Sequence, residues 1–110
     1  MKMEGDGVKV EITARNDGVS ERAREYAEKK ISKMSRFFER ITSARVVLES
    51  EGDRHKAEMV LAAGGGATLV GEATDSESLY AAIDTAVDKL ERQVKKHKEK
   101  LVERNRKRPR

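Results

Sequence analysis

Residues 75–110 read DSESLYAAIDTAVDKLERQVKKHKEKLVERNRKRPR, and this stretch decides the fold because its pattern predicts one long amphipathic helix. Its apolar residues recur at spacings of three and four, which places them on one face of a helix with 3.6 residues per turn. These residues are Leu79, Ala82, Ile83, Ala86, Val87, Leu90, Val94 and Leu101. Such a face needs an apolar layer to pack on, so we expect the rest of the chain to supply it.

The same helix carries a stripe of cations, displaced by about 120° from its apolar face. The stripe consists of Lys89, Arg92, Lys96 and Lys100. Residues 89–110 hold eleven Lys or Arg against three Asp or Glu, a balance of +8, whereas residues 1–88 have a balance of −4. This asymmetry indicates a polyanionic partner, with nucleic acid first and an acidic membrane or protein second.

The composition limits the possible classes of protein. With 110 residues the chain forms one domain, and aromatic residues make up only 4% of it, so aliphatic side chains must fill the core. The absence of cysteine excludes disulfides and thiolate metal sites. No apolar run approaches the ~20 residues of a membrane span. Residues 1–7, an N-terminal leader, lack the apolar centre of a signal peptide, so we expect a cytoplasmic protein.

The first half of the chain predicts a strand followed by a helix. Val8, Val10, Ile12 and Ala14 alternate with polar residues, which is typical of a strand with one buried face. Ser20 is the expected cap of a helix that runs to about residue 40. The apolar face of this helix is expected to hold Ala23, Tyr26, Ala27, Ile31, Met34, Phe37, Phe38 and Ile41. A second basic line is formed by Arg22, Lys29, Lys33, Arg36 and Arg40.

Three further strands are expected at residues 44–50, 56–63 and 67–74, joined by turns at 51–55 and 64–66. Asp75 or Ser76 is the expected cap of the final helix. The order β-α-β-β-β-α predicts an α+β fold, a four-stranded sheet with two helices packed on one face, similar in topology to double-stranded-RNA-binding domains. We assign residues 8–103 to this domain and 104–110 to a basic tail. Parallel helices would then present one positive surface on the helical side.

Several motifs resemble those of the ribosome hibernation-promoting factor family, also called the protein Y or ribosome-associated inhibitor family. In the first helix they are Arg24-Glu25-Tyr26, Glu28-Lys29-Lys30-Ile31 and Arg40-Ile41. In the final helix they are Leu79-Tyr80-Ala81-Ala82-Ile83-Asp84, Asp88-Lys89-Leu90-Glu91-Arg92-Gln93 and Lys95-Lys96-His97-Lys98. The third strand begins with the familiar Lys56-Ala57-Glu58. The resemblance covers residues 8–101, and the final-helix motif is the most specific part of it. One departure is Glu21, where many members have proline.

The resemblance implies a factor that binds the small ribosomal subunit at 16S rRNA of the decoding region. It would overlap the path of messenger RNA and the transfer-RNA sites, and so keep ribosomes idle in stress or stationary phase. The residues it implies for contact with ribosomal RNA are Lys30, Lys33, Arg36, Lys89, Arg92 and Lys96; Lys100 extends the same stripe. No cofactor, metal, membrane or small-molecule substrate is expected. Longer members dimerise through a second domain, so this chain is either a short member or an N-terminal domain.

Other readings of these features remain open. A generic double-stranded-RNA binder, or a protein-interaction module with a basic tail, would also carry basic helices. An enzyme is not expected, because no nucleophile, base and orienting group can be assembled, and His55 and His97 lack the spacing of a metal pair. Gly64–Gly66 lacks the lysine of a phosphate loop. We expect ion pairs Asp88–Arg92 and Glu91–Lys95 beside Asp84, and Tyr80 to be partly exposed.

Overall fold

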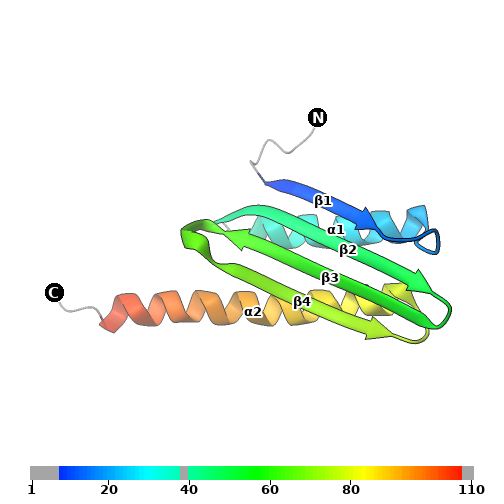
Figure 1. The fold of residues 1–110 in the computed structure, drawn as a ribbon. Helices are drawn as coiled ribbons and strands as arrows, with labels where there is room; N and C mark the ends of the chain where they lie inside the picture. Colours follow the sequence, from blue (N-terminus) through cyan, green and yellow to red (C-terminus); the bar gives the residue numbers. More distant parts are fainter. Residues whose placement is uncertain (1–7, 38–39, 108–110) are drawn as a thin grey trace.

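The computed structural model describes residues 8–37 and 40–107, with side chains described up to His97 except at Phe37. The elements follow the predicted order: β1 (Lys9–Ala14), α1 (Glu21–Phe37), β2 (Ile41–Glu51), β3 (Arg54–Ala63), the short 3-10 turn η2 (Gly64–Gly66), β4 (Thr68–Asp75) and α2 (Leu79–Lys107). Four strands form one sheet and both helices lie on the same side of it (Figure 1), so the predicted α+β class is confirmed.

The sheet has the strand order β1-β2-β3-β4, in which β1 and β2 are parallel and the other neighbours are antiparallel. Parallel neighbours need a crossover connection, and α1 supplies it. Helix α1 packs on β1 and β2, whereas α2 packs on β4 and β3. Both helices run in the same direction across the sheet (Figure 1), as the sequence analysis assumed. Their side chains can therefore be compared as two parallel rows.

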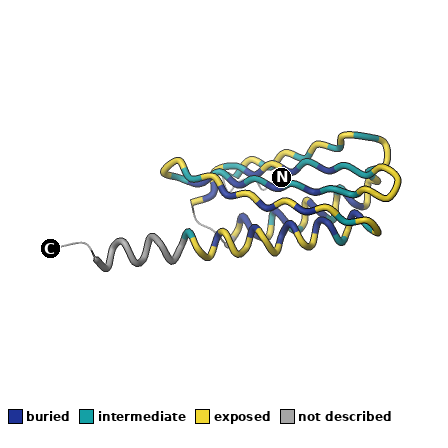
Figure 2. Tube along the Cα trace, turned by 60° about the horizontal axis from the view of Figure 1, so that its bottom comes forward, coloured by how far each residue is buried: buried dark blue, intermediate teal, exposed yellow. Residues whose placement is uncertain are grey.

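The core lies between the sheet and the helices, where the buried positions gather (Figure 2). Along each inner strand buried and accessible residues alternate, because successive side chains point to opposite faces. The predicted apolar face of α2 is buried from Leu79 to Val94, and the side chain of Leu101 lies outside the described residues. Aliphatic side chains such as Ile31, Leu48, Met59, Ile83 and Leu90 are fully buried.

Two boundaries differ from the sequence prediction. Ile41 was placed on the apolar face of the first helix, but it begins β2, pairs with Ala63 and is buried there. Helix α1 ends at Phe37 in the described structure, and Phe38 lies outside the described residues. The final helix continues to Lys107, into residues 104–110 that the sequence assigns to a basic tail. Apolar spacing marks only packed turns of a helix, so it underestimates a helix that extends past its core.

Of the caps predicted for the two helices, that of α1 is confirmed and that of α2 is wrong. Ser20 caps α1 as predicted: its hydroxyl accepts a hydrogen bond of 3.1 Å from the amide of Ala23. The predicted caps Asp75 and Ser76 of α2 are wrong, because the hydroxyl of Ser78 accepts from the amides of Tyr80 and Ala81. Asp75 instead closes the preceding turn, where its carboxylate accepts from the amides of Glu77 and Ser78 at 2.8 and 2.9 Å. Because of this turn, Ser78 is the cap of α2 and the helix begins at Leu79.

The first prediction concerns the carboxylate of Asp75, which accepts two amide hydrogen bonds in this turn. Hydrogen bonds from the Glu77 amide and then the Ser78 amide lower the pKa of the Asp75 carboxyl. A carboxyl with a lower pKa in the folded chain stabilises the fold above its unfolded pKa, and this contribution is lost as pH falls through the folded pKa. We expect Asp75→Asn, which accepts hydrogen bonds but cannot ionise, to lose stability less steeply between about pH 4 and pH 2. Urea midpoints across this range measure it, and equal slopes would contradict it.

Within the described part of the chain, neither helix combines the length and apolar character needed to cross a membrane.

Candidate nucleic-acid interface

The first group of predicted site residues lies on α1, on the side away from the sheet. Ala27 and Ile31 are fully buried against the core, and Lys33 and Arg36 are exposed on the opposite side of the helix. Arg22 and Lys29 are exposed along the same side. We call these four residues the α1 strip. Their side chains are available to an anionic surface that approaches from the helical side.

The second group lies on α2, on the side next to β4. The ammonium group of Lys89 donates a hydrogen bond of 3.0 Å to the backbone carbonyl of Glu72, which fixes the direction of this side. Arg92 and Lys96 follow three and seven residues later, so helical geometry places them within about 60° of Lys89. All three are exposed. We call Lys89, Arg92 and Lys96 the α2 strip; the side chain of Lys100 lies outside the described residues.

A cluster of polar and aromatic side chains joins the two helices. The phenolic hydroxyl of Tyr26 donates a hydrogen bond of 2.6 Å to the carboxylate of Asp84. The ammonium of Lys30 lies 3.7 Å from the same carboxylate and 5.2 Å from the centre of the Tyr26 ring. Tyr80 meets Tyr26 edge to face, with ring centres 5.1 Å apart. The hydrogen bond to Asp84 raises the pKa of Tyr26, burial and the charge of Asp84 add to this, and Lys30 opposes it.

These contacts show which side of α2 faces α1, and that side carries charges of both signs. Asp84 contacts α1 directly, Glu91 follows two helical turns later on nearly the same side, and the exposed Lys95 follows one turn after Glu91. The α1 strip and the α2 strip are therefore separated by a side of α2 with mixed charge, so the described cations do not form the single positive surface expected from the sequence. Among the predicted site residues, the positive charge of Lys30 is the least available to a ligand, because Lys30 is half-buried and paired with Asp84.

The ion pairs expected along α2 are not formed. Among side chains that the structure describes, neither Asp88 with Arg92 nor Glu91 with Lys95 comes within 4.0 Å, although their spacing allows it. Arg92 and Lys95 are exposed, as are both carboxylates. Pairs of this kind contribute little at an exposed helix surface. Among the side chains that the structure describes, Arg92 therefore has no ion-pair partner on its own helix.

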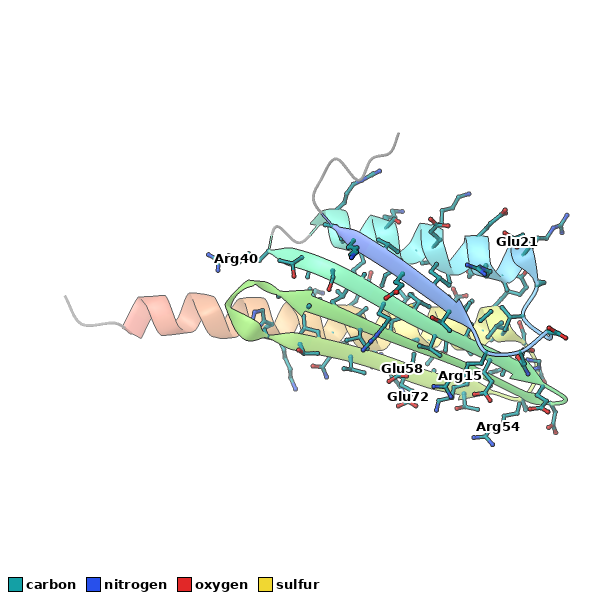
Figure 3. The ribbon with its side chains drawn as sticks, turned by 45° about the horizontal axis from the view of Figure 1, so that its top comes forward. Arg15, Glu21, Arg40, Arg54, Glu58 and Glu72 are labelled. Carbon is teal, nitrogen blue, oxygen red and sulfur yellow. The ribbon has the colours of Figure 1, made fainter. Side chains whose placement is uncertain are left out.

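The other face of the sheet has a mixed charge. Opposite charges face each other across the strands at Glu11 with Arg45 and at Glu49 with Lys56. The carboxylates of Glu58 and Glu72 are also neighbours (Figure 3), and Lys56 forms an ion pair of 3.0 Å with Glu72. The opposite charges in cross-strand positions attract, whereas Glu58 and Glu72 are a like-charge pair whose repulsion is offset by the ion pair of Lys56 with Glu72. A polyanion would therefore meet the α1 strip and the α2 strip on the helical side and a balanced surface on this one.

The two histidines lie on different elements, His55 in β3 and His97 in α2. The Nδ1 atom of His55 is 2.6 Å from the hydroxyl of Ser50, and His55 is half-buried rather than on the open surface. No group of three His, Cys, Asp or Glu side chains comes together within the residues that the structure describes. Tyr80 is 39% exposed, as predicted. Sequence reasoning missed the hydrogen bond between Tyr26 and Asp84, because no local spacing connects residues 58 positions apart.

The chain matches a protein family and several individual proteins by sequence. A sequence model of the family described as Sigma 54 modulation protein / S30EA ribosomal protein matches residues 10–102. The ribosome hibernation promoting factor of Azotobacter vinelandii is 43% identical over 97 residues, which cover 88% of this chain and 89% of that protein. The protein of the same name from Escherichia coli K12 is 36% identical over 94 residues, covering 86% and 97% of the two chains.

Two solved structures share the fold. A ribosomal subunit interface protein from Coxiella burnetii superposes with a TM-score of 0.71 at 21% identity, covering 82% of this chain and 97% of that one. At this identity the likeness shows the fold alone. The N-terminal domain of Protein Y from Thermus thermophilus gives a TM-score of 0.66 at 38% identity, covering 79% and 94%.

Proposed function

Since the chain belongs to the Sigma 54 modulation protein / S30EA ribosomal protein family, as its motifs predicted, we propose that it is a ribosome hibernation factor. In this proposal it binds the small ribosomal subunit at 16S rRNA of the decoding region and inhibits translation by blocking the sites of messenger RNA and transfer RNA. The names of its relatives support an association with the ribosome. The observation that carries the choice of surface is the pair of cationic strips on the helical side of the sheet.

The proposed mechanism is electrostatic and steric. Lysine and arginine that neutralise phosphates release condensed counterions, so the affinity falls steeply with salt. Folded RNA is recognised largely by its shape and backbone, which suits side chains fixed on two packed helices. Lys89 is compatible with this role, because an ammonium has three donors and the carbonyl of Glu72 accepts only one of them. Binding would block the decoding region without any chemical step.

Co-sedimentation with purified small subunits tests the proposal. We expect the chain to sediment with small subunits at low salt, to dissociate at high salt, and to compete with transfer RNA. Equal affinity for an unrelated RNA duplex would favour a generic double-stranded-RNA binder instead. Failure to bind any RNA, with retained binding to an acidic protein, would favour the protein-interaction module.

Removing the charge of Asp84 gives the second prediction. Asp84→Asn keeps an acceptor for the Tyr26 hydroxyl but releases the ammonium of Lys30 for RNA. We expect affinity for the small subunit to rise several-fold, and the dependence of log affinity on log salt to steepen by up to about one unit.

Asp88→Asn is the matched control for this substitution. It removes one exposed carboxylate from the same helix, one turn away, and Asp88 has no ion-pair partner among the described side chains. A smaller increase in the salt dependence is expected, since no lysine is released. If both variants change the salt dependence equally, the pairing of Lys30 with Asp84 does not limit RNA binding.

A further inference from the structure

Tyr80 presents an aromatic surface that the packing of the domain does not use. The residue is 39% exposed, and the only other large apolar residue as exposed within the described part of the chain is Val70, on the far face of the sheet. Tyr80 lies in the first turn of α2, on the side that faces α1. The ring lies beside basic residues of α1, and an aromatic ring next to cations is a combination that binds nucleic acid.

The ring of Tyr80 is supported by its neighbours. Tyr26 meets it edge to face with an angle of 74° between the ring planes, and the hydroxyl of Tyr26 is itself held by Asp84. The ammonium of Lys30 lies over the Tyr26 ring. Because the two rings are nearly perpendicular, a flat ligand can lie parallel to only one of them. Tyr26 is half-buried and already covered by Lys30, so Tyr80 is the ring left for stacking.

The surroundings of Tyr80 define the kind of ligand. A shallow hollow beside it is lined by both tyrosines and by the α1 strip, Arg22, Lys29, Lys33 and Arg36. Glu25 and Glu28 also line the hollow, which leaves an excess of positive charge. Recognition of unpaired nucleotides combines these two elements, an aromatic ring under the base and cations on the phosphates. An acidic peptide would use the cations but leave the ring without a partner.

From this arrangement we infer that Tyr80 is a stacking platform for one unpaired RNA base, whose flanking phosphates are bound by the α1 strip. The inference rests on the proposed function and extends it, because it adds contact with a base to contacts with the RNA backbone. It also gives the hydrogen bond between Tyr26 and Asp84 a role in positioning the stacking ring. That bond fixes Tyr26, and Tyr26 fixes the ring of Tyr80.

The test compares two probes of similar charge, a short oligoadenylate and inorganic polyphosphate. We expect the chain to bind oligoadenylate more tightly, and Tyr80→Leu to lose roughly 5- to 150-fold of that affinity while polyphosphate binding is unchanged. Leucine keeps an apolar side chain against Tyr26, and Tyr80→Phe, which keeps the ring, should retain the affinity. Tyr26 and Tyr80 are the only tyrosines and the chain has no tryptophan, so intrinsic fluorescence reports this pair. Oligoadenylate should change it and polyphosphate should not.

Two results would overturn the inference. One is equal affinity of the parent chain for both probes. The other is a Tyr80→Leu variant that melts at the parent temperature and binds oligoadenylate as the parent does. Sedimentation of Tyr80→Leu with small subunits separates this failure from failure of the proposed function. If the parent and Tyr80→Leu sediment alike, the stacking role is wrong and the ribosomal role stands, whereas a parent chain that does not sediment removes the ribosomal role itself.

Discussion

Gly71→Ala is expected to destabilise the domain by about 3 kcal/mol, which lowers the melting temperature by roughly 12–24 °C. Gly71 is buried in β4 directly beneath α2. A Cβ atom at this position would overlap the carbonyl oxygen of Ala86 and lie 2.9 Å from the amide nitrogen of Leu90. Both are backbone atoms of the helix, so a change of side-chain rotamer cannot relieve the overlap. The helix would have to move away from the sheet.

Gly64→Ala is the matched control. A Cβ there would lie 3.7 Å from the carbonyl oxygen of Arg40, an ordinary contact, and its backbone needs no positive φ. We expect its melting temperature to stay near that of the parent or to rise slightly, because alanine restricts the unfolded chain. Thermal unfolding followed by circular dichroism measures both variants. If Gly71→Ala melts with the parent, α2 does not pack against β4 as closely as the structure has it.

Gly71 also illustrates what the sequence could and could not predict. The apolar face of α2 follows from a local period, and burial from Leu79 to Val94 agrees with it. The alternation in β1 and the Ser20 cap are local in the same sense. The close approach at Gly71 is not local, because it depends on which strand the helix covers. A glycine within a strand pattern signals such an approach only after the topology is known.

The candidate site likewise has features that the sequence predicts and features that it does not. The sequence predicts that Lys33, Arg36 and Arg92 are exposed, because their spacing places them away from the apolar face of each helix. The separation into two strips does not, because it depends on which side of each helix meets its neighbour. That side is set by Tyr26 and Asp84, residues far apart in the chain that meet only when α1 and α2 pack together.

The double substitution Lys89→Glu with Lys96→Glu is expected to abolish binding to the small subunit while leaving the fold intact. Both side chains are exposed, so the free energy of unfolding should change by no more than about 0.5 kcal/mol for each. Each reversal removes a cation from the α2 strip and adds a charge that repels phosphate. We expect a loss of about tenfold or more for each residue, equivalent to about 1.4 kcal/mol, and a salt dependence shallower by about two units.

Arg15→Glu with Arg54→Glu is the matched control for this loss. Both arginines are exposed and lie at the end of β1 and the start of β3 (Figure 3), on other elements than the α2 strip. The two double variants carry the same change in net charge, so long-range attraction to RNA weakens equally in both. Binding should therefore fall far less in the control at a given salt concentration.

The comparison of the two double variants decides between a defined surface and general attraction. If binding falls equally in both, only the net charge of the chain matters, and the α2 strip has no particular role. If Lys89→Glu with Lys96→Glu lowers the melting temperature strongly, the hydrogen bond from Lys89 to the Glu72 carbonyl is part of the packing of α2 on β4. A selective loss of binding with an unchanged melting temperature is the result that a phosphate-binding row on the outer side of α2 requires.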